Sequence, residues 1–407
     1  MARSIGVLLV LVAACGGGSS QGASGQDAAT DGEGTGPDAG GGTDGATSND
    51  ATANDSASKD AAGGGDAGGP VDACAPSPGS GSATIHTIGR FDTSDPAGPK
   101  FAWPGSTIVA TFDGTGISAQ LNDNVGNNFF VVVVDGGMPT AFRTSQGTST
   151  YPLATGLASG KHTISLVKRT ESYDGIVQLL ALTPTGGALV ATPEPWARRI
   201  EFIGDSITCG YGVLGGSCTN PSVDQEDWTV TAGALAAAQL HAEPTTIAYS
   251  GIGMYRDYSG STTNQMPTRF LLTLADIPTS TWGFTTPPPD VVVIDLGTND
   301  FAAGDPGTAF QTTYTTFVQQ ELRAHYPKAW IILAVSPMLS GTQRTQISTY
   351  LNGVVSTLKA AGDMRVAYFE YDVEQTMGCQ YHPDVATNQA MATKIVPFIE
   401  QLTGWCP

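Results

Sequence analysis

Apolar residues between about residues 84 and 195 recur in short runs separated by turn residues. Four of these runs are strand candidates: Ser106–Phe112, Asn128–Val134, His162–Val167 and Gly175–Leu182. The breaks between runs hold turn signals such as Asp113-Gly114 and Ser159-Gly160. Short strands joined by glycine-containing turns are typical of a β-sandwich or jelly roll. We therefore predict an all-β domain over residues 83–195. Nothing in it has catalytic spacing, which favours an accessory role.

The period of the pattern changes in residues 196–407. Five short apolar runs follow one another along the chain: Arg199–Ile203, Thr245–Tyr249, Val291–Leu296, Trp330–Val335 and Arg365–Phe369. Helical stretches lie between or after several of them: Thr229–Leu240, Gly307–His325, Thr345–Ala361 and Val385–Leu402. Alternating strands and helices predict a parallel sheet covered by helices on both faces. We therefore predict an α/β domain over residues 196–407.

The N-terminal segment has a different composition. Residues 1–15 contain Arg3, the apolar run Ile5–Val12 and then Ala13-Ala14-Cys15, which predicts a secretory signal. A cysteine after two alanines resembles a bacterial lipobox, in which Cys15 is lipidated. The alternative is a plain signal peptide cut nearby. We expect a protein outside the cytoplasm, anchored by lipid to a bacterial membrane or cell surface, or else secreted.

Residues 16–82 are rich in Gly, Ala, Asp, Ser and Thr. Residues 16–73 hold ten acidic residues and one lysine, with almost no large apolar side chain. Such a segment buries too little apolar area to offset chain entropy, so we predict a disordered tether.

The charge of the whole chain excludes some partners. The chain has 407 residues, with 18 Lys+Arg against 37 Asp+Glu. It has no basic cluster of the kind that binds phosphate backbones, so we expect no nucleic-acid partner. No apolar run reaches about 18 residues, so we expect membrane contact only through the lipid anchor.

The cysteines are expected to form disulfides, because an exported location favours them. We expect Cys209–Cys218 first and Cys379–Cys406 second, with Cys74 left over, although sequence leaves the pairing open. Cys379 and His382 have the spacing of a zinc-ligand pair. No second pair lies nearby in the sequence, so we expect no metal.

Candidate chemistry follows the predicted strands of the α/β domain, because ligands in such sheets bind at the carboxyl ends of the strands. The first run is followed by Asp205 and Ser206, the second by Gly251 and the third by Asn299. A serine on a tight strand-to-helix turn is well placed as a nucleophile. A glycine lets the backbone approach a substrate, and an asparagine amide can donate to an oxyanion. For Asn299 an Asx-turn or a helix cap is the alternative.

Only one of the five histidines is expected on the same edge. His86 and His162 lie in the β-rich part, and His241 and His325 lie at the ends of predicted helices. His382 follows the last predicted strand and precedes a helix-start signal. We therefore predict His382 as the general base.

These blocks together resemble the SGNH (GDSL-type) hydrolases. The four blocks are Gly204-Asp205-Ser206, Gly251, Gly297-Thr298-Asn299-Asp300 and His382. Carbohydrate esterase family 2 is the nearer resemblance. It rests also on Ile200–Gly212, on Lys168-Arg169-Thr170-Glu171 and on Gly378–Pro383, and it covers roughly residues 84–405. The resemblance implies a jelly-roll domain followed by a flavodoxin-like SGNH-hydrolase domain, and removal of acetyl groups from polysaccharides such as xylan or mannan.

One position departs from the SGNH pattern. Many SGNH enzymes have an Asp three residues before the histidine, where this chain has Cys379. Some members of family 2 are similar to this chain in using a Ser-His dyad whose imidazole is held by a backbone carbonyl. The resemblance therefore implies a dyad of Ser206 and His382. We expect Asp384 to cap the following helix rather than to complete a triad.

Besides the general base His382, the expected site has four residues with assigned roles and some aromatic neighbours. Ser206, Gly251 and Asn299 are expected to form the oxyanion hole, and Asp205 to support the nucleophile turn. Four aromatic residues are candidates for stacking on sugars, although core packing is the alternative for each: Tyr211, Trp228, Trp282 and Trp405.

We expect the protein to be a serine esterase that releases acetate from an acetylated polysaccharide or oligosaccharide. No metal or organic cofactor is expected, and the protein is expected to be a monomer. One alternative is a lipid or thioester hydrolase on the same fold. Another is a surface glycan-binding protein with a vestigial esterase site.

Overall fold

The computed structural model describes residues 84–193, 196–216 and 218–406. The predictions for Cys15, for Cys74 and for the tether over residues 16–82 lie outside these residues. No helix in the described ranges is both long and apolar enough to span a bilayer.

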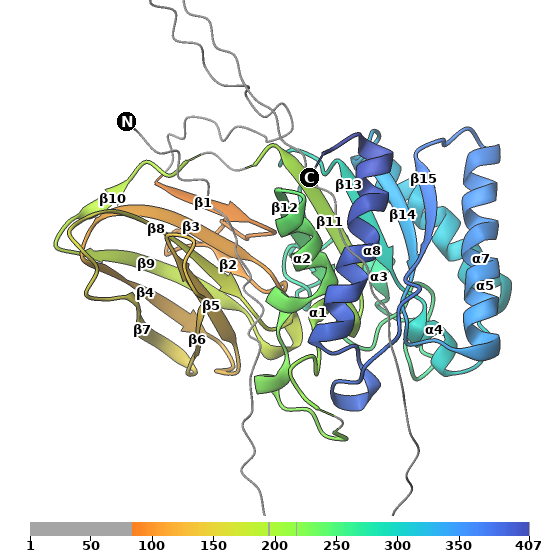
Figure 1. Ribbon diagram of the computed structural model, residues 1–407, viewed down its shortest axis with the longest axis horizontal. Coiled ribbons are helices and arrows are strands. Elements are labelled where there is room, and N and C mark those ends of the chain that lie inside the picture. Colours follow the sequence, from red (N-terminus) through yellow and green to blue (C-terminus); the bar gives the residue numbers. More distant parts are fainter. Residues whose placement is uncertain (1–83, 194–195, 217, 407) are drawn as a thin grey trace, which may run out of the picture. The chain divides into compact units, whose positions relative to one another are not determined.

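The first part is built of two antiparallel sheets (Figure 1). One sheet has the order β1-β3-β8-β5-β6, with β10 paired to β3, and the other has the order β2-β9-β4-β7. The strands are β1 (Ile85–Ile88), β2 (Lys100–Phe101), β3 (Thr107–Gly114), β4 (Gly116–Asp123), β5 (Phe129–Val134), β6 (Thr140–Arg143), β7 (Gly147–Ala154), β8 (Gly160–Lys168), β9 (Val177–Thr185) and β10 (Ala188–Val190). The all-β prediction is confirmed.

Alternation along these strands makes the core of the β domain. In β3, Ile108, Ala110 and Phe112 are fully buried and share one cluster with Ala119 and Leu121 of β4. Successive side chains of a strand point to opposite faces, so each sheet supplies every second residue to the common core. A short 3-10 helix, Ser172–Asp174, separates β8 from β9.

The second part is a five-stranded sheet whose strands are all parallel, in the order β12-β11-β13-β14-β15. The strands are β11 (Arg198–Gly204), β12 (Ala242–Ala248), β13 (Val291–Asp295), β14 (Trp330–Val335) and β15 (Val366–Glu370). The helices are α1 (Ser206–Cys209), α2 (Ala232–Gln239), α3 (Met266–Arg269), α4 (Thr298–Ala302), α5 (Gly307–Thr316), α6 (Arg323–His325), α7 (Gly341–Ala360) and α8 (Val385–Thr403). This is the doubly wound order of flavodoxin-like folds, which confirms the predicted fold class.

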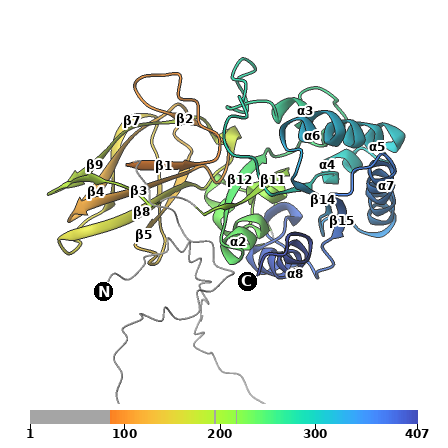
Figure 2. The same ribbon diagram turned by 90° about the horizontal axis from the view of Figure 1, so that it is seen from above.

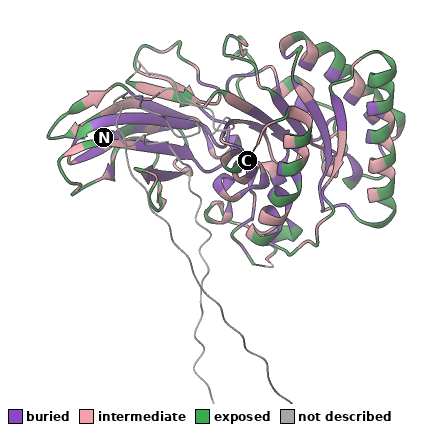
Figure 3. Ribbon diagram, turned by 45° about the horizontal axis from the view of Figure 1, so that its top comes forward, coloured by how far each residue is buried: buried purple, intermediate pink, exposed green. Residues whose placement is uncertain are grey.

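Each face of the parallel sheet has its own helices (Figure 2). Val292 and Ile294 of β13 join a cluster that includes residues of α5 and α7, whereas Val291 and Val293 join a cluster with α2 and α8. The central strands are therefore buried on both sides, as Figure 3 shows in purple. This double burial explains why these strands are continuous apolar runs in the sequence.

The long predicted helices are present with small shifts at their ends. The expected helix over residues 307–325 consists of α5, a π-helical stretch over Phe317–Leu322 and α6. The short helices α1, α3 and α4 were not predicted, because segments of four or five residues carry no readable apolar period.

The register of the sheet positions the site. Gly204 of β11 lies opposite Ala248 of β12 and opposite Asp295 of β13. These three neighbouring strands therefore end at the same edge. Ser206, Gly251 and Asn299 follow within four residues of those positions, which brings three distant blocks of sequence together.

Candidate active site

The serine and histidine selected from the sequence are in direct contact. The Oγ of Ser206 lies 2.7 Å from the Nε2 of His382, and each residue is 8 % exposed. Ser206 is the first residue of α1 and lies two residues after the end of β11, whereas His382 lies in the loop between β15 and α8. The contact has the length of a good hydrogen bond, and a nucleophile with an adjacent base is the arrangement used for acyl transfer.

The other ring nitrogen of His382 faces backbone rather than a carboxylate. Its Nδ1 lies 3.1 Å from the carbonyl oxygen of Gln380 and 3.3 Å from that of Cys379. A carbonyl only accepts, so Nδ1 carries the proton and Nε2 is left to accept from Ser206. Burial lowers the pKa of His382 and the two carbonyls oppose that effect, so the imidazole is favoured in its neutral form.

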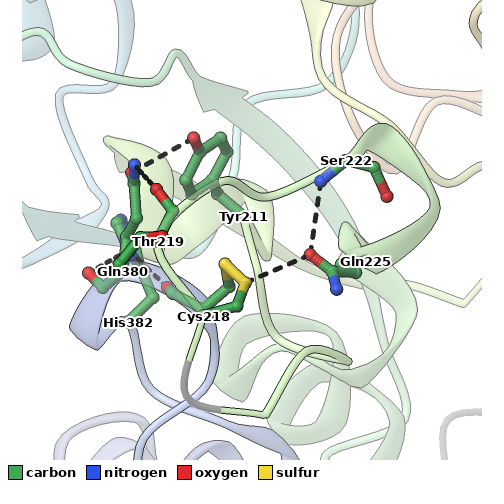
Figure 4. Close-up of a disulfide and its surroundings, with 8 residues drawn as sticks. Tyr211, Cys218, Thr219, Ser222, Gln225, Gln380 and His382 are labelled. Carbon is green, nitrogen blue, oxygen red and sulfur yellow. Dashed lines mark hydrogen bonds between the residues drawn. A yellow bond between two sulfur atoms is a disulfide. The ribbon is translucent and has the colours of Figure 1, made fainter.

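Two residues in an uncommon conformation bring those carbonyls to the ring. Gln380 and Tyr381 have φ of 50° and 63°, the left-handed region that non-glycine residues seldom adopt. The N–H of Gln380 donates to the carbonyl of Cys218 at 2.8 Å, and its side-chain amide donates to the carbonyl of Thr219 at 2.8 Å (Figure 4). The neighbouring loop therefore holds the strained turn in place.

A disulfide fastens the same two loops. Cys218 is bonded to Cys379, with their Cα atoms 4.5 Å apart (Figure 4). Both predicted pairings are wrong. Cys209 is a buried free thiol on α1, and Cys406 is disulfide-bonded but not to Cys379. Sequence spacing favoured nearby partners, whereas the fold brings the loop after α1 beside the loop between β15 and α8.

Cys379 is in a disulfide and therefore has no thiolate that could bind a metal. The Cys379–His382 spacing is thus not that of a zinc-ligand pair in this structure. In the described ranges no group of three or more His, Cys, Asp or Glu side chains is arranged to hold a metal ion.

Ser206 and the two residues predicted to share its oxyanion hole differ in how their donors are engaged. The backbone N–H groups of Ser206 and Gly251 have no acceptor among the described residues. Gly251 has φ of 81°, so this position requires glycine. The Nδ2 of Asn299 lies 3.0 Å from Oδ2 of Asp205 and 2.8 Å from the carbonyl of Ile252, so its amide is engaged by the protein on both sides.

Asp205 links the nucleophile turn to the asparagine. Its Oδ1 accepts from the N–H of Ile207 at 3.0 Å and caps α1, while Oδ2 accepts from Asn299. Asp205 is fully buried, and this burial raises its pKa to about 7. These contacts agree with the expected supporting role of Asp205, because its carboxylate is buried and bonds to other residues of the protein.

Asp300 organises the loop that carries Gly251, a role that the sequence did not reveal. Its buried carboxylate accepts the N–H groups of Met254, Tyr255 and Arg256 at 2.9, 2.7 and 2.9 Å. A Cβ on Gly253 would lie 2.3 Å from Oδ2 of Asp300, so only glycine fits there. In the sequence Asp300 appears only as the last residue of the Gly297-Thr298-Asn299-Asp300 block, and that position does not show which N–H groups it binds.

The four aromatic candidates separate into one neighbour of the site and three residues elsewhere. The ring centroid of Tyr211 lies 4.9 Å from that of His382, and its hydroxyl donates to Oε1 of Gln380 at 3.3 Å. Trp228 is 1 % exposed and donates to Oγ1 of Thr246, so it is a core residue rather than a sugar platform.

Trp282 and Trp405 lie toward the start of β11, away from its carboxyl end. Trp282 lines a small cavity with Arg199 and Ile200, and the guanidinium of Arg198 lies 5.2 Å from the ring centroid of Trp405. Their predicted part in sugar stacking at this site is therefore wrong. The exposed Tyr258, whose ring carbon lies 3.1 Å from where a Cβ of Gly251 would be, was not predicted.

Asp384 caps α8, as expected. Its Oδ1 accepts from the N–H of Thr387 at 2.9 Å and from the hydroxyl of Thr376 at 2.7 Å. Both nitrogens of His382 already have other partners.

A serine–histidine pair at the carboxyl edge of a doubly wound sheet, with an asparagine on the neighbouring strand end, defines the chain as an SGNH-type hydrolase fold. Residues 202–389 match the GDSL-like Lipase/Acylhydrolase family, and residues 87–193 match the Carbohydrate esterase 2 N-terminal family. The structure of a family two carbohydrate esterase from Clostridium thermocellum in complex with cellohexaose is 40 % identical. The match covers 79 % of this chain and all of that one, with a TM-score of 0.76. The chain therefore belongs to carbohydrate esterase family 2.

Two curated relatives are similar over most of this chain. The cellulase/esterase CelE of Acetivibrio thermocellus is 40 % identical over 78 % of this chain, which spans 39 % of the length of that relative. An acetylxylan esterase / glucomannan deacetylase of Cellvibrio japonicus is 28 % identical over 79 % of this chain and 89 % of its own length.

Proposed function

We propose that this protein is an esterase that removes O-acetyl groups from polysaccharides of the xylan or glucomannan type. The observation that carries the proposal is the 2.7 Å contact between Ser206 Oγ and His382 Nε2, beside two backbone N–H groups with no acceptor in the described structure. The names of the relatives support the substrate class, because one is an acetylxylan esterase / glucomannan deacetylase and another is a cellulase/esterase.

In the first step Ser206 Oγ attacks the acetyl carbonyl carbon, and its proton passes to His382 Nε2. The negative charge on the carbonyl oxygen is held by the N–H groups of Ser206 and Gly251. Asn299 is the third donor, through the amide hydrogen that faces the carbonyl of Ile252. A donor of this kind contributes about 3–4 kcal/mol to stabilisation of the transition state.

The tetrahedral adduct then breaks its bond to the sugar oxygen. That oxygen takes the proton from Nε2, which leaves a free sugar hydroxyl and an acetyl group on Ser206. In the second half a water molecule gives a proton to Nε2 and attacks the acetyl carbon. The bond between the acetyl carbon and Ser206 Oγ then breaks, Oγ takes the proton from Nε2, and the product leaves as acetic acid, which loses its proton to water to give acetate. During both halves the carbonyls of Cys379 and Gln380 stabilise the imidazolium in place of a triad carboxylate.

The test is acetate release from acetylated xylan, acetylated glucomannan and 4-nitrophenyl acetate by three variants. Ser206→Ala and His382→Ala are each expected to lose at least about 10³-fold in kcat. His162→Ala is the matched control, since that histidine lies on β8 and bonds to Asp135. Activity of Ser206→Ala within tenfold of wild type would overturn the proposal.

The same substrates separate the alternatives. A lipid or thioester hydrolase would prefer long-chain esters or acyl thioesters over acetylated polysaccharide. A glycan-binding protein with a vestigial site would bind polysaccharide equally well in wild type and Ser206→Ala and release acetate in neither.

We also propose that Cys15 is lipidated and that residues 16–82 act as a spacer between membrane and enzyme. The support is the sequence alone: an apolar segment ending in Ala-Ala-Cys, followed by a polar tract of low complexity. Expression of the full chain in a bacterial host with a labelled fatty acid tests it. Wild type is expected to carry label and to sediment with membranes, and Cys15→Ser to do neither. A labelled Cys15→Ser protein would overturn this assignment.

A further inference from the structure

A glutamate of the β domain reaches the loop that carries the second oxyanion donor. Glu171 lies between β8 and β9, at the start of the 3-10 helix over Ser172–Asp174, and is almost fully buried. Its Oε2 accepts from the N–H of Ser250 at 2.8 Å, and its Oε1 accepts from the hydroxyl of Ser250. Ser250 follows β12 and directly precedes Gly251. One carboxylate therefore accepts from both the N–H and the hydroxyl of the residue that precedes Gly251.

Glu171 is itself held on its main chain from two sides. Its N–H donates to Oε1 of Glu226 at 2.5 Å, and its carbonyl accepts from Nζ of the buried Lys168 at 2.8 Å. The Sγ of Cys209, on the helix that begins with Ser206, lies 3.7 Å from Oε2 of Glu171. The carboxylate is thus fixed between the nucleophile helix and the loop of Gly251.

We propose that Glu171 is a positioning residue for the esterase reaction, because it fixes Ser250, the residue directly before Gly251, and so helps to aim the N–H of Gly251 at the oxyanion. The inference rests on the proposed function, in which that N–H is a donor. Gly251, whose φ is 81°, has no side chain that could hold it in place. An error of about 1 Å in a catalytic group can cost about 10²-fold in rate.

The contact also joins the two family modules. Glu171 lies within residues 87–193, matched by the N-terminal model, and Ser250 lies within residues 202–389, matched by the hydrolase model. The β domain thus completes the active site rather than only accompanying it.

Two conservative variants separate the effect of the length of the Glu171 side chain from the effect of its charge. Glu171→Asp keeps the charge but is one methylene shorter, so it is expected to lower kcat at least tenfold with KM within threefold. Glu171→Gln keeps the reach: its oxygen accepts from the N–H of Ser250 and its amide donates to the hydroxyl oxygen. It is expected to keep kcat within about fivefold. A merely electrostatic or structural role predicts the opposite order, with Glu171→Asp the more active of the two.

A double variant tests the route through Ser250. Ser250→Ala removes only the hydroxyl bond, so a loss below fivefold is expected. In the combination of Glu171→Asp with Ser250→Ala, the loss is expected to stay near that of Glu171→Asp alone, because both changes act on one contact. Losses that multiply would overturn the inference.

The control for stability is Arg90→Ala. Arg90 also comes from the β domain, and its guanidinium donates to the carbonyls of Phe270 and Leu272 away from Ser206. It is expected to lower the melting temperature with kcat within threefold at a temperature where it is folded.

Each of these variants is made in the full chain and assayed on 4-nitrophenyl acetate and on acetylated xylan. Wild-type kcat in Glu171→Asp, with Ser206→Ala inactive, would overturn this inference alone. Activity in Ser206→Ala would instead overturn the proposed function. If Glu171→Asp does not fold, Glu171→Gln decides, because a tenfold loss of kcat in that variant contradicts the reach argument.

Discussion

The side-chain amide of Asn299 donates to Oδ2 of Asp205 at 3.0 Å, so the strand end after β13 is tied to the nucleophile turn after β11. The same carboxylate accepts the N–H of Ile207 and caps the nucleophile helix. A single buried aspartate therefore links the turn that carries the proposed nucleophile to the proposed oxyanion donor Asn299.

Asp205→Asn tests this link. An asparagine that accepts from Ile207 presents its own amide to the amide of Asn299, so two donors face each other and Asn299 is displaced. We expect kcat to fall about 10–100-fold with KM little changed, since a lost oxyanion donor costs about 10²–10³ in kcat. Steady-state kinetics on 4-nitrophenyl acetate measures it.

Asp384→Asn is the matched control, because asparagine is as good a helix N-cap as aspartate. It is expected to keep kcat within threefold. A large loss of kcat in Asp384→Asn with an unchanged melting temperature would mean that Asp384 serves His382 as a third catalytic member, contrary to the dyad.

Gly253→Ala tests the loop fastened by Asp300. The added Cβ would lie 2.3 Å from Oδ2 of Asp300 and 2.2 Å from the carbonyl of Arg256, so the carboxylate or the loop must move. We expect kcat to fall at least tenfold and the melting temperature to fall as well. Gly216→Ala is the control, because a Cβ there meets no atom within 4 Å. Equal kcat in both variants would show that the position of this loop does not matter for the rate.

Replacing Cys218 and Cys379 together by Ala tests the disulfide at the histidine loop. The bond joins residues separated by 161 positions, and removal of a native disulfide costs about 2–5 kcal/mol of stability. The carbonyls at Nδ1 are backbone groups, and the bonds of Gln380 to the loop over residues 218–219 remain. We expect a lower melting temperature with kcat within tenfold at low temperature. A collapse of kcat with unchanged melting would give the cysteines a direct catalytic role.

The pH dependence follows from His382. The base must be neutral to accept the proton of Ser206, and burial lowers its pKa below the usual value of about 6.5. The acid limb of kcat/KM should therefore have its midpoint below pH 6.5, with activity lost as pH falls through it.

Two other groups near the site titrate higher, because burial raises the pKa values of Glu171 and Asp205 to about 7. The limb measured for Glu171→Gln should coincide with that of wild type. A midpoint near 7 that moves in this variant would assign the limb to Glu171 instead of His382.

Much of the site could be predicted from the sequence. Ser206, Gly251, Asn299 and His382 follow apolar runs, and in a parallel sheet the ends of neighbouring strands share one edge. The order of blocks along the chain therefore implied the meeting of residues up to 176 positions apart. The sequence also showed that no acidic residue stands at position 379, because this observation needs only the residue type at one position.

Tertiary structure decided what depends on contacts between distant surfaces. The pairing of Cys218 with Cys379 arises because the loops that carry them lie side by side. The spacing of cysteines along the sequence does not show that contact. The burial of Trp228 depends on packing around the sheet, and the reach of Glu171 to Ser250 depends on how a loop of the β domain meets the end of β12. Apolar periodicity determines which elements form and which of their faces are buried, whereas a hydrogen bond between two loops is fixed only when the whole core has packed.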